Sequence, residues 1–234
     1  NVRVAMSSYT GTAVSFGVLR DADYTADNIY YENGLARFDV LFRGEYVTHI
    51  ELSVPGRHNI YNALAAFAAA MLCGLSPESV GEGLSLYVGA SRRMEYKGKF
   101  RGIDVYDDYA HHPTEIAATI QAARGVHQGR LVAVFQPHRY SRTKFLADKF
   151  AESFQLADEV ILTDVYSAGE DLSEGAESTA IINHMDQSVQ MVHREKLNGF
   201  LLEFVQPGDM VLMMGAGNIW QNSMQLVEDL KHKK

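Results

Sequence analysis

A cluster of residues that could do chemistry lies at positions 107–115, which read Asp-Asp-Tyr-Ala-His-His-Pro-Thr-Glu. The cluster follows an apolar run at positions 103–106 that predicts a strand, and it leads into apolar residues at helical spacing. Open α/β sheets bind ligands outside the carboxyl ends of their strands, where this turn falls. A solvated turn with a capped helix would explain Pro113, Thr114 and Glu115. It would not explain two acids, a tyrosine and two histidines in six positions.

A second polar cluster occupies positions 135–143, which read Phe-Gln-Pro-His-Arg-Tyr-Ser-Arg-Thr. It also follows an apolar strand and precedes an amphipathic helix, so we expect it beside the first cluster at the same edge of the sheet. His138, Arg139 and Arg142 at a helix N-terminus would suit a carboxylate or a phosphate. A solvated basic loop is the alternative, and the position at a strand's carboxyl end favours the binding site.

Two shorter motifs could bind a nucleotide. Asn59 and Asn62 are three residues apart and share a helical face, and two carboxamides offer the donors and acceptors that a purine edge needs. On this motif alone, Asn59 as a simple helix cap is the favoured alternative. Arg93 lies just before the expected domain junction and could clamp a phosphate, or it could form a surface ion pair with Glu95.

Three other patterns give weaker evidence about function. The Gly-Ala-Gly-Asn segment at positions 215–218 lacks the third glycine of a dinucleotide-binding fingerprint, so a tight helix entry is expected there. His111 and His112 are adjacent and point in different directions, so no metal site is expected. A Gly-x-x-x-x-Gly-Lys-Ser/Thr phosphate loop is absent from the sequence.

Composition limits the class of protein. A chain of 234 residues, 47% of them apolar, supports one large hydrophobic core or two modest ones. A formal net charge of −8 argues against a general nucleic-acid binder, and the longest apolar run, at positions 63–75, is too short to span a bilayer. The single cysteine, Cys73, rules out an internal disulfide and is expected to fill the core. These features favour a cytoplasmic, reducing location.

The order of elements predicts an α/β protein of two units, residues 1–98 and 99–234. In the first, strand patterns at positions 12–17 and 37–54 turn at Arg43-Gly44 and precede two helices, the second with Ser76 as its cap. In the second, strands alternate with helices, which predicts a doubly wound, mostly parallel, Rossmann-like sheet. The expected strands are 103–108, 131–136, 159–163, 189–192 and 210–214. The expected helices are 113–123, 141–156, 179–185, 196–205 and 219–230.

Together these motifs resemble the Mur ligases, the ATP-dependent amide-bond ligases of bacterial cell-wall synthesis. The resemblance runs over essentially the whole chain, and the longer segments are similar to those of the members that add alanine. The segments and residues that carry it are 56–63, Arg93, 107–115, 135–143, 163–170 and 214–217. Met94, where an aromatic residue is common, and Asn218, where an acid is common, depart from the family pattern.

The resemblance implies a C-terminal Rossmann-like ligase domain preceded by the last part of a central ATPase domain. It also implies joining of L-alanine to the carboxylate of UDP-N-acetylmuramate through an acyl phosphate, with ATP and Mg²⁺ as cofactors. Asn59 and Asn62 would hold adenine, Arg93 would contact the ATP phosphates, and Asp108 would lie on the nucleotide side. The acceptor and the muramoyl carboxylate would be positioned by Tyr109, His111, His138, Arg139 and Arg142. Arg93, His111 and His138 would take part in catalysis.

In the family, the phosphate loop, the magnesium ligands and the UDP-binding domain precede the point where this chain starts. We therefore expect a truncated ligase that is inactive alone and binds nucleotide weakly at most. Two alternatives stay open: a ligase that attaches a preformed peptide to the same muramate substrate, and a stand-alone Rossmann-like ligand-binding module without catalysis. Small molecules are the expected partners, and the sequence predicts no oligomeric state.

Overall fold

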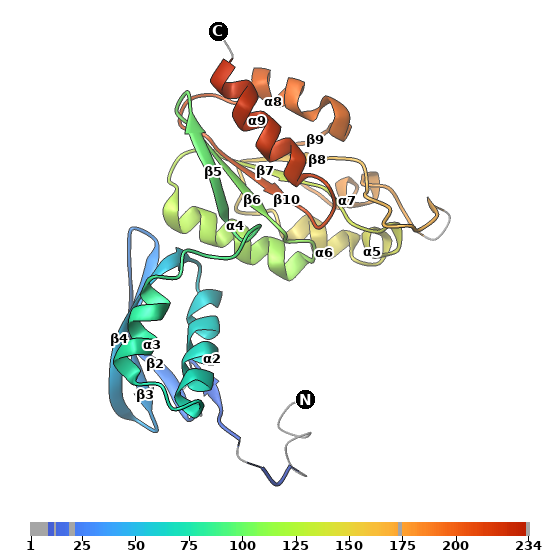
Figure 1. Ribbon diagram of the computed structural model, residues 1–234. Coiled ribbons are helices and arrows are strands. Elements are labelled where there is room, and N and C mark those ends of the chain that lie inside the picture. The colour runs from blue at the N-terminus through green and yellow to red at the C-terminus, as the bar shows by residue number, and fades with distance from the viewer. Residues whose placement is uncertain (1–8, 12, 19–21, 173–174, 233–234) are drawn as a thin grey trace. The chain divides into compact units, whose positions relative to one another are not determined.

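The computed structural model describes residues 9–11, 13–18, 22–172 and 175–232 (Figure 1). The chain divides into two compact units, Asn1–Tyr87 and Val88–Lys234, each with its own hydrophobic core. Gly98, near which the junction was expected from the sequence, lies inside a strand of the second unit. No helix in the described ranges is long and apolar enough to cross a membrane.

The first unit contains a four-stranded sheet in the order β1-β2-β3-β4. Its strands are β1 (Phe16–Gly17), β2 (Tyr24–Glu32), β3 (Leu35–Phe42) and β4 (Glu45–Pro55). The predicted β3–β4 hairpin is confirmed, and its turn residues Arg43 and Gly44 both adopt positive φ angles of 51° and 91°. The strand expected at positions 12–17 is reduced to the two residues of β1, and Thr12 lies outside the described residues. Strand β2 was not expected, because its outer half is largely exposed and shows no regular alternation of apolar and polar residues.

Two helices cover this sheet, α2 (His58–Leu72) and α3 (Pro77–Ser85). Ile60, Leu64 and Phe67 of α2 are almost fully buried against the sheet, as their helical spacing predicts. Ser76 caps α3 by accepting a hydrogen bond from the Ser79 amide, which confirms the predicted helix start. Cys73 is exposed at the end of α2, so the expectation that it fills the core is wrong.

The second unit is built on a six-stranded sheet in the order β5-β6-β10-β7-β8-β9. The five predicted strands are confirmed as a parallel set. They are β6 (Ile103–Asp108), β7 (Leu131–Phe135), β8 (Glu159–Leu162), β9 (Val189–Met191) and β10 (Met210–Met214). An antiparallel edge strand that the sequence did not predict, β5 (Glu95–Phe100), pairs with β6. The last strand, β10, is inserted between β6 and β7.

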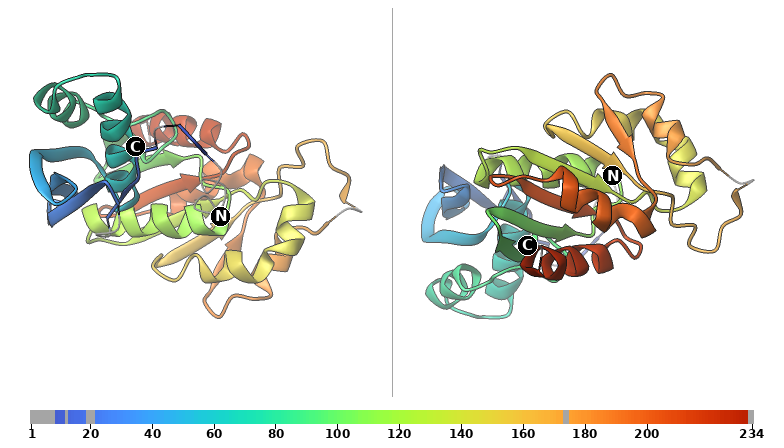
Figure 2. Two further views of the ribbon diagram at one scale, coloured as in Figure 1. Left: turned by 90° about the horizontal axis from the view of Figure 1, so that it is seen from below. Right: turned by 90° about the horizontal axis from the view of Figure 1, so that it is seen from above.

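Helices cover both faces of this sheet, so the predicted doubly wound architecture is confirmed. Figures 1 and 2 show α8 and α9 on one face and α4 to α7 on the other. The helices are α4 (Pro113–Val126), α5 (Tyr140–Phe145), α6 (Ala147–Glu152), α7 (Thr179–Ile182), α8 (Leu197–Phe204) and α9 (Trp220–His232), with a 3-10 turn, η2 (Arg194–Lys196), before α8. Along β7, Leu131 and Phe135 enter one core while Val132 and Val134 enter the other, because successive strand residues face opposite sides.

The helix expected at positions 141–156 is broken into α5 and α6. Leu146 leaves the helical region, with φ −121° and ψ 18°, and its partly buried side chain packs against the core. Helical periodicity continues across the break because residues on both sides still face the same sheet.

Candidate active site

Four aromatic rings form a row at the carboxyl edge of the six-stranded sheet. Tyr109 and His111 come from the turn after β6, and their ring centroids are 5.2 Å apart. His138, from the turn after β7, lies 6.1 Å from His111 and 5.5 Å from Tyr166, which follows β8. The two predicted clusters therefore meet at one edge as expected, although β10 lies between the strands that carry them.

His138 is held in place by backbone pairing with Tyr166. The Arg139 amide donates to the Tyr166 carbonyl at 2.8 Å, and the Tyr166 amide donates to the Pro137 carbonyl at 2.8 Å. The Nδ1 atom of His138 is buried and has no hydrogen-bond partner among the described residues. Burial, reinforced by the positive charge of Arg142, lowers the pKa of His138 below its ordinary value. The ring is therefore held as a neutral imidazole.

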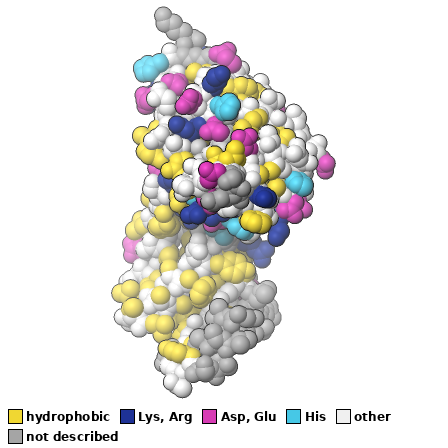
Figure 3. Space-filling view, turned by 90° about the vertical axis from the view of Figure 1, so that its right-hand side faces the viewer, with side chains coloured by type: hydrophobic (Ala, Val, Ile, Leu, Met, Phe, Trp, Pro, Cys, Tyr) yellow, Lys and Arg dark blue, Asp and Glu magenta, His cyan; other side chains and the backbone are white. Residues whose placement is uncertain are grey.

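Two arginines stand beside this row with few partners of their own. Arg139 adopts a left-handed φ of 73°, a conformation that is uncommon outside glycine and often found at functional sites. Its guanidinium lies 3.4 Å from Glu170, a carboxylate already bonded by the amide and hydroxyl of Ser141. Arg142 makes a long 3.5 Å contact with the His111 carbonyl. Figure 3 shows Lys, Arg and His side chains gathered along one border of the second unit.

The two adjacent histidines have different roles. His112 is the N-cap of α4, where its Nδ1 atom accepts from the Thr114 amide, and Glu115 completes a capping box. His111 instead faces the ring row, and its Nδ1 atom lies 2.9 Å from the Tyr109 carbonyl and 3.3 Å from Glu115 Oε2. Since both neighbours are acceptors, Nδ1 is the donor, and Nε2 is the proton-accepting nitrogen of the neutral ring.

Asp108 braces the end of β6. Its side chain is 3% exposed, and its two oxygens accept from the amides of Met94 at 2.8 Å and Ala110 at 2.7 Å. Burial raises the pKa of Asp108, and these backbone donors oppose that rise. The role on the nucleotide side that the resemblance implies for Asp108 stays a prediction.

Arg93 does not form the ion pair with Glu95 that was considered from the sequence. Glu95 binds the Arg92 amide at 2.7 Å and Lys97 at 2.8 Å. The Arg93 side chain is exposed, with its guanidinium carbon 5.9 Å from the centroid of the Tyr109 ring. A cation placed in this way remains accessible to an anion.

Arg92 was missed from the sequence, where only its neighbour was singled out. Its guanidinium carbon lies 4.8 Å from the centroid of the Tyr109 ring, and its backbone carbonyl accepts from the Tyr109 amide at 2.7 Å. The same guanidinium bonds the fully buried Asp107 at 3.3 Å and the carbonyl of Gly215. Burial raises the pKa of Asp107, and the charge of Arg92 opposes that rise. Arg92 therefore joins the turns after β6 and β10 and positions Tyr109.

In the first unit, Asn59 and Asn62 lie side by side at a pocket of about 310 Å³. The cap of α2 is Arg57, so the interpretation of Asn59 as a helix cap is wrong. Asn59 instead donates to the Pro55 carbonyl at 2.8 Å, and Asn62 donates to Asn59 Oδ1 at 3.0 Å. The other lining residues are Leu52, Val54, Ala63, Ala66, Leu84 and Tyr87. Apolar walls with two carboxamides at one side fit a flat purine base.

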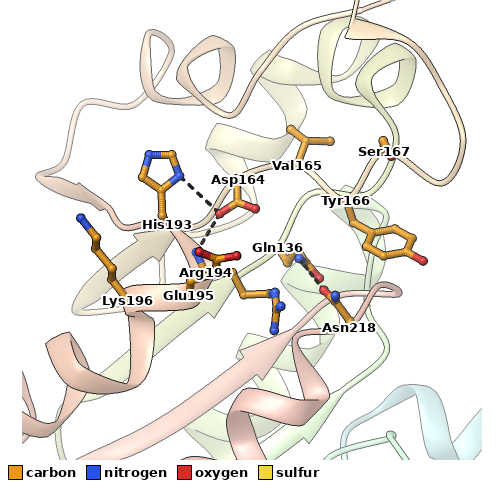
Figure 4. A pocket seen from close by; sticks show the side chains of 10 residues that line it. All are labelled: Gln136, Asp164, Val165, Tyr166, Ser167, His193, Arg194, Glu195, Lys196 and Asn218. Atoms are coloured by element: carbon orange, nitrogen blue, oxygen red, sulfur yellow. Dashed lines mark hydrogen bonds and ion pairs between the residues drawn. The ribbon is translucent and has the colours of Figure 1, made fainter.

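The second unit has a separate pocket of about 570 Å³ at the same carboxyl edge (Figure 4). It is lined by Gln136, Asp164, Val165, Tyr166, Ser167, His193, Arg194, Glu195, Lys196 and Asn218. Gln136 donates to Asn218 Oδ1 at 3.0 Å and accepts from the Ile219 amide at 3.1 Å, which confirms that the glycine turn is a tight helix entry. Within the described residues, no group of three or more His, Cys, Asp or Glu side chains could hold a metal ion.

Comparisons with family models and with known proteins point to the same family. Residues 92–217 match the family model "Mur ligase, glutamate ligase domain", and residues 2–70 match "Mur ligase middle domain". The chain is 46% identical to the UDP-N-acetylmuramate–L-alanine ligase of Salinibacter ruber, with 99% of this chain and 50% of the relative covered. It spans about half the length of the curated relatives that it matches.

Two solved structures agree with this match. UDP-N-acetylmuramate–alanine ligase MurC from Thermotoga maritima superposes with a TM-score of 0.79 at 30% identity, covering 94% of this chain and 48% of that chain. A murein peptide ligase from Psychrobacter arcticus has a TM-score of 0.68 at 26% identity, covering 94% and 46%. Matches to both domain models, and sequence identity over nearly all of its residues, show that this chain belongs to the Mur ligase family.

Proposed function

We propose that this chain is the part of a cytoplasmic UDP-N-acetylmuramate–L-alanine ligase that binds the acceptor amino acid and the adenine of ATP. The ligase would work in peptidoglycan synthesis. The observation that carries the proposal is the row of Tyr109, His111 and His138 beside Arg139 and Arg142. The names and identity of the curated relatives support alanine as the acceptor.

The acceptor site has the groups that this chemistry needs. Arg139 and Arg142 would bind the carboxylate of alanine, since guanidinium groups pair with carboxylates in a planar, bidentate way. The ammonium group of alanine must lose a proton before it can attack, and the imidazole of His138, whose lowered pKa favours the neutral form, offers an acceptor for that proton. His111, the next ring in the row, is the second candidate for this role. The same cations would stabilise the negative charge that develops on the tetrahedral intermediate.

Each unit carries groups that suit one part of a nucleotide. The pocket at Asn59 and Asn62 fits adenine, and the exposed guanidinium of Arg93 suits a phosphate. Asp108 would act on the nucleotide side by holding the segment that carries Arg93. ATP would supply the phosphoryl group that activates the muramoyl carboxylate, and the ligands of Mg²⁺ are expected outside this chain.

The test is release of phosphate from ATP in the presence of UDP-N-acetylmuramate and L-alanine. A complete ligase, in which this chain follows the segment that carries the phosphate loop, is expected to release phosphate only when alanine is present. The 234-residue chain alone is expected to release none. Alanine-dependent phosphate release by the chain alone would contradict our proposal that the active site also needs the segment that carries the phosphate loop.

The similarity to a murein peptide ligase supports one alternative function, a ligase that attaches a preformed peptide. If the chain belonged to a peptide-attaching enzyme, a tripeptide that begins with L-alanine would replace free alanine as the better acceptor. We expect the reverse, with free alanine giving the higher kcat/KM. The remaining alternative is a stand-alone binding module without catalysis. Calorimetric titration of the chain with ATP, alanine and the muramate substrate tests it, because such a module would bind one of these ligands tightly.

A further inference from the structure

Tyr166 is placed between the candidate acceptor site and the pocket of about 570 Å³. Its ring stacks on His138 with an interplanar angle of 16° and a centroid distance of 5.5 Å. The same residue lines the pocket, whereas His138 does not. Tyr166 therefore contributes to the boundaries of both spaces.

The backbone and the base of the Tyr166 side chain are fixed from two sides. The backbone of Tyr166 is paired in both directions with the segment that carries His138, through the Pro137 carbonyl and the Arg139 amide. On the other side, a Cβ atom placed on Gly217 would lie 2.7 Å from Cγ of Tyr166, so only glycine leaves room for the ring there. Although Tyr166 is 38% exposed, these constraints hold its ring stacked against His138.

The pocket beyond Tyr166 is polar and larger than alanine requires. Figure 4 shows Tyr166 and Ser167 on one side, His193 and Lys196 on the other, and the side chain of Arg194 between them. The carboxylate of Asp164 is already engaged by the Arg194 amide at 2.7 Å. The remaining hydroxyl, amide and cationic groups suit a polar side chain better than an apolar one.

We propose that Tyr166 is a specificity-determining residue that limits the acceptor site to the size of alanine. Removing its ring joins the acceptor site to the polar pocket and admits a larger polar L-amino acid such as glutamine. This inference rests on the proposed function. It goes beyond that function by assigning the selection against larger acceptors to one ring.

The test uses the complete ligase with three acceptors, L-alanine, L-glutamine and L-leucine, in wild type, Tyr166→Ala and Tyr166→Phe. In Tyr166→Ala, the ratio of kcat/KM for glutamine to that for alanine is expected to rise at least about 10-fold, a typical effect of one side chain in a fitted pocket. Leucine is expected to gain less than glutamine because the lining is polar. Tyr166→Phe keeps the ring, so its ratio is expected to match wild type whatever its absolute rate.

Equal loss of kcat/KM for all three acceptors in Tyr166→Ala would overturn the proposal, since it would make the ring only a support for His138. Should the alanine variant not fold, Tyr166→Leu tests the same role with a smaller loss of packing. Turnover of wild type with alanine distinguishes a failure of the proposed function from a failure of the role proposed for Tyr166. If wild type is inactive with alanine, the proposed function fails; if it is active and the ratios do not change, the role of Tyr166 fails.

Discussion

The protonation state of His138 is set by the residues around it. Its ring is half-buried, its buried Nδ1 atom lacks a hydrogen-bond partner among the described residues, and Arg142, His111 and Arg139 all oppose a positive charge there. Each of these features favours the neutral ring, which is the form that could take a proton from an ammonium group. Arg142, in contrast, makes one long hydrogen bond within the described part of the chain, so we expect its side chain to do little for the fold.

The lowered pKa of His138 predicts a pH-dependent contribution to stability. Because the unfolded chain protonates this histidine more readily than the folded protein, the contribution is present above pH about 6.5 and is lost as pH falls toward the folded-state pKa. Urea unfolding of wild type and His138→Gln at several pH values measures this. The stability difference, wild type minus variant, should fall as pH is lowered. A difference that does not change with pH would show that the environment does not disfavour the charged ring.

Arg142→Ala tests the role of the acceptor-site cations. In the complete ligase, we expect kcat/KM for alanine to fall about 100-fold or more, because a charge-assisted contact to substrate is worth about 3 kcal/mol. The melting temperature should stay within error of wild type. Lys144→Ala is the matched control, since it removes one exposed positive charge from the same short helix. Loss of stability in step with activity would instead make Arg142 a structural residue.

At the scale of elements, strand ends and turns decide where the chemistry lies. β6, β7, β8 and β10 all deliver their following turns to one edge, because parallel strands point the same way. In the first unit, the β3–β4 hairpin depends on a two-residue turn with positive φ at both positions. This geometry matches the right-handed twist of the flanking strands.

Gly44→Ala should destabilise the first unit by about 1–2 kcal/mol, the usual cost of a side chain in the left-handed region. At Gly44 φ is 91°, and no atom lies within 4 Å of the position that a Cβ atom would take, so backbone strain is the whole effect. Gly83→Ala is the matched control, because Gly83 lies in α3, has the same open surroundings and should gain about 1 kcal/mol. Thermal melting of both variants measures the two shifts, and a shift of the same sign in both would contradict the assigned turn geometry.

At the scale of the whole molecule, two units with separate cores share one chain. The second unit begins at Val88 and includes β5, which covers the edge of β6. The segment before β5 supplies Arg92, the partner of buried Asp107, and Met94, whose amide binds Asp108. The fold of the second unit therefore depends on residues that precede the junction expected at Gly98.

Two truncations test this boundary. The fragment 88–234 should fold alone, whereas 99–234 should be strongly destabilised. Without β5 the edge of β6 is unpaired, and without Arg92 the carboxylate of Asp107 is buried with no counter-charge, a loss of about 3–5 kcal/mol for such a pair. Amide dispersion in NMR spectra and urea unfolding report both effects. Equal stability of the two fragments would place the boundary at Gly98 after all.

Much of this molecule was predictable from local sequence. Continuous apolar runs predicted the buried parallel strands, because a strand covered on both faces is apolar at every position. Polar clusters that follow such runs had to fall at the carboxyl edge of the sheet, so Tyr109, His111, His138, Arg139 and Arg142 could be named in advance. Strands β2 and β5 could not. β5 is a polar edge strand, and β2, although it lies between β1 and β3, is largely exposed in its outer half, so neither has a continuous apolar run.

Tertiary structure alone decided which of these residues meet. The insertion of β10 between β6 and β7 is a long-range pairing choice that no local pattern records. The same choice brings Arg92 to the carbonyl of Gly215, while the pairing of β7 with β8 places Tyr166 against His138. The sequence by itself determined which side chains stand at the edge of the sheet. Their neighbours across that edge depend on strand order, because contacts between distant segments form only when the sheet is assembled.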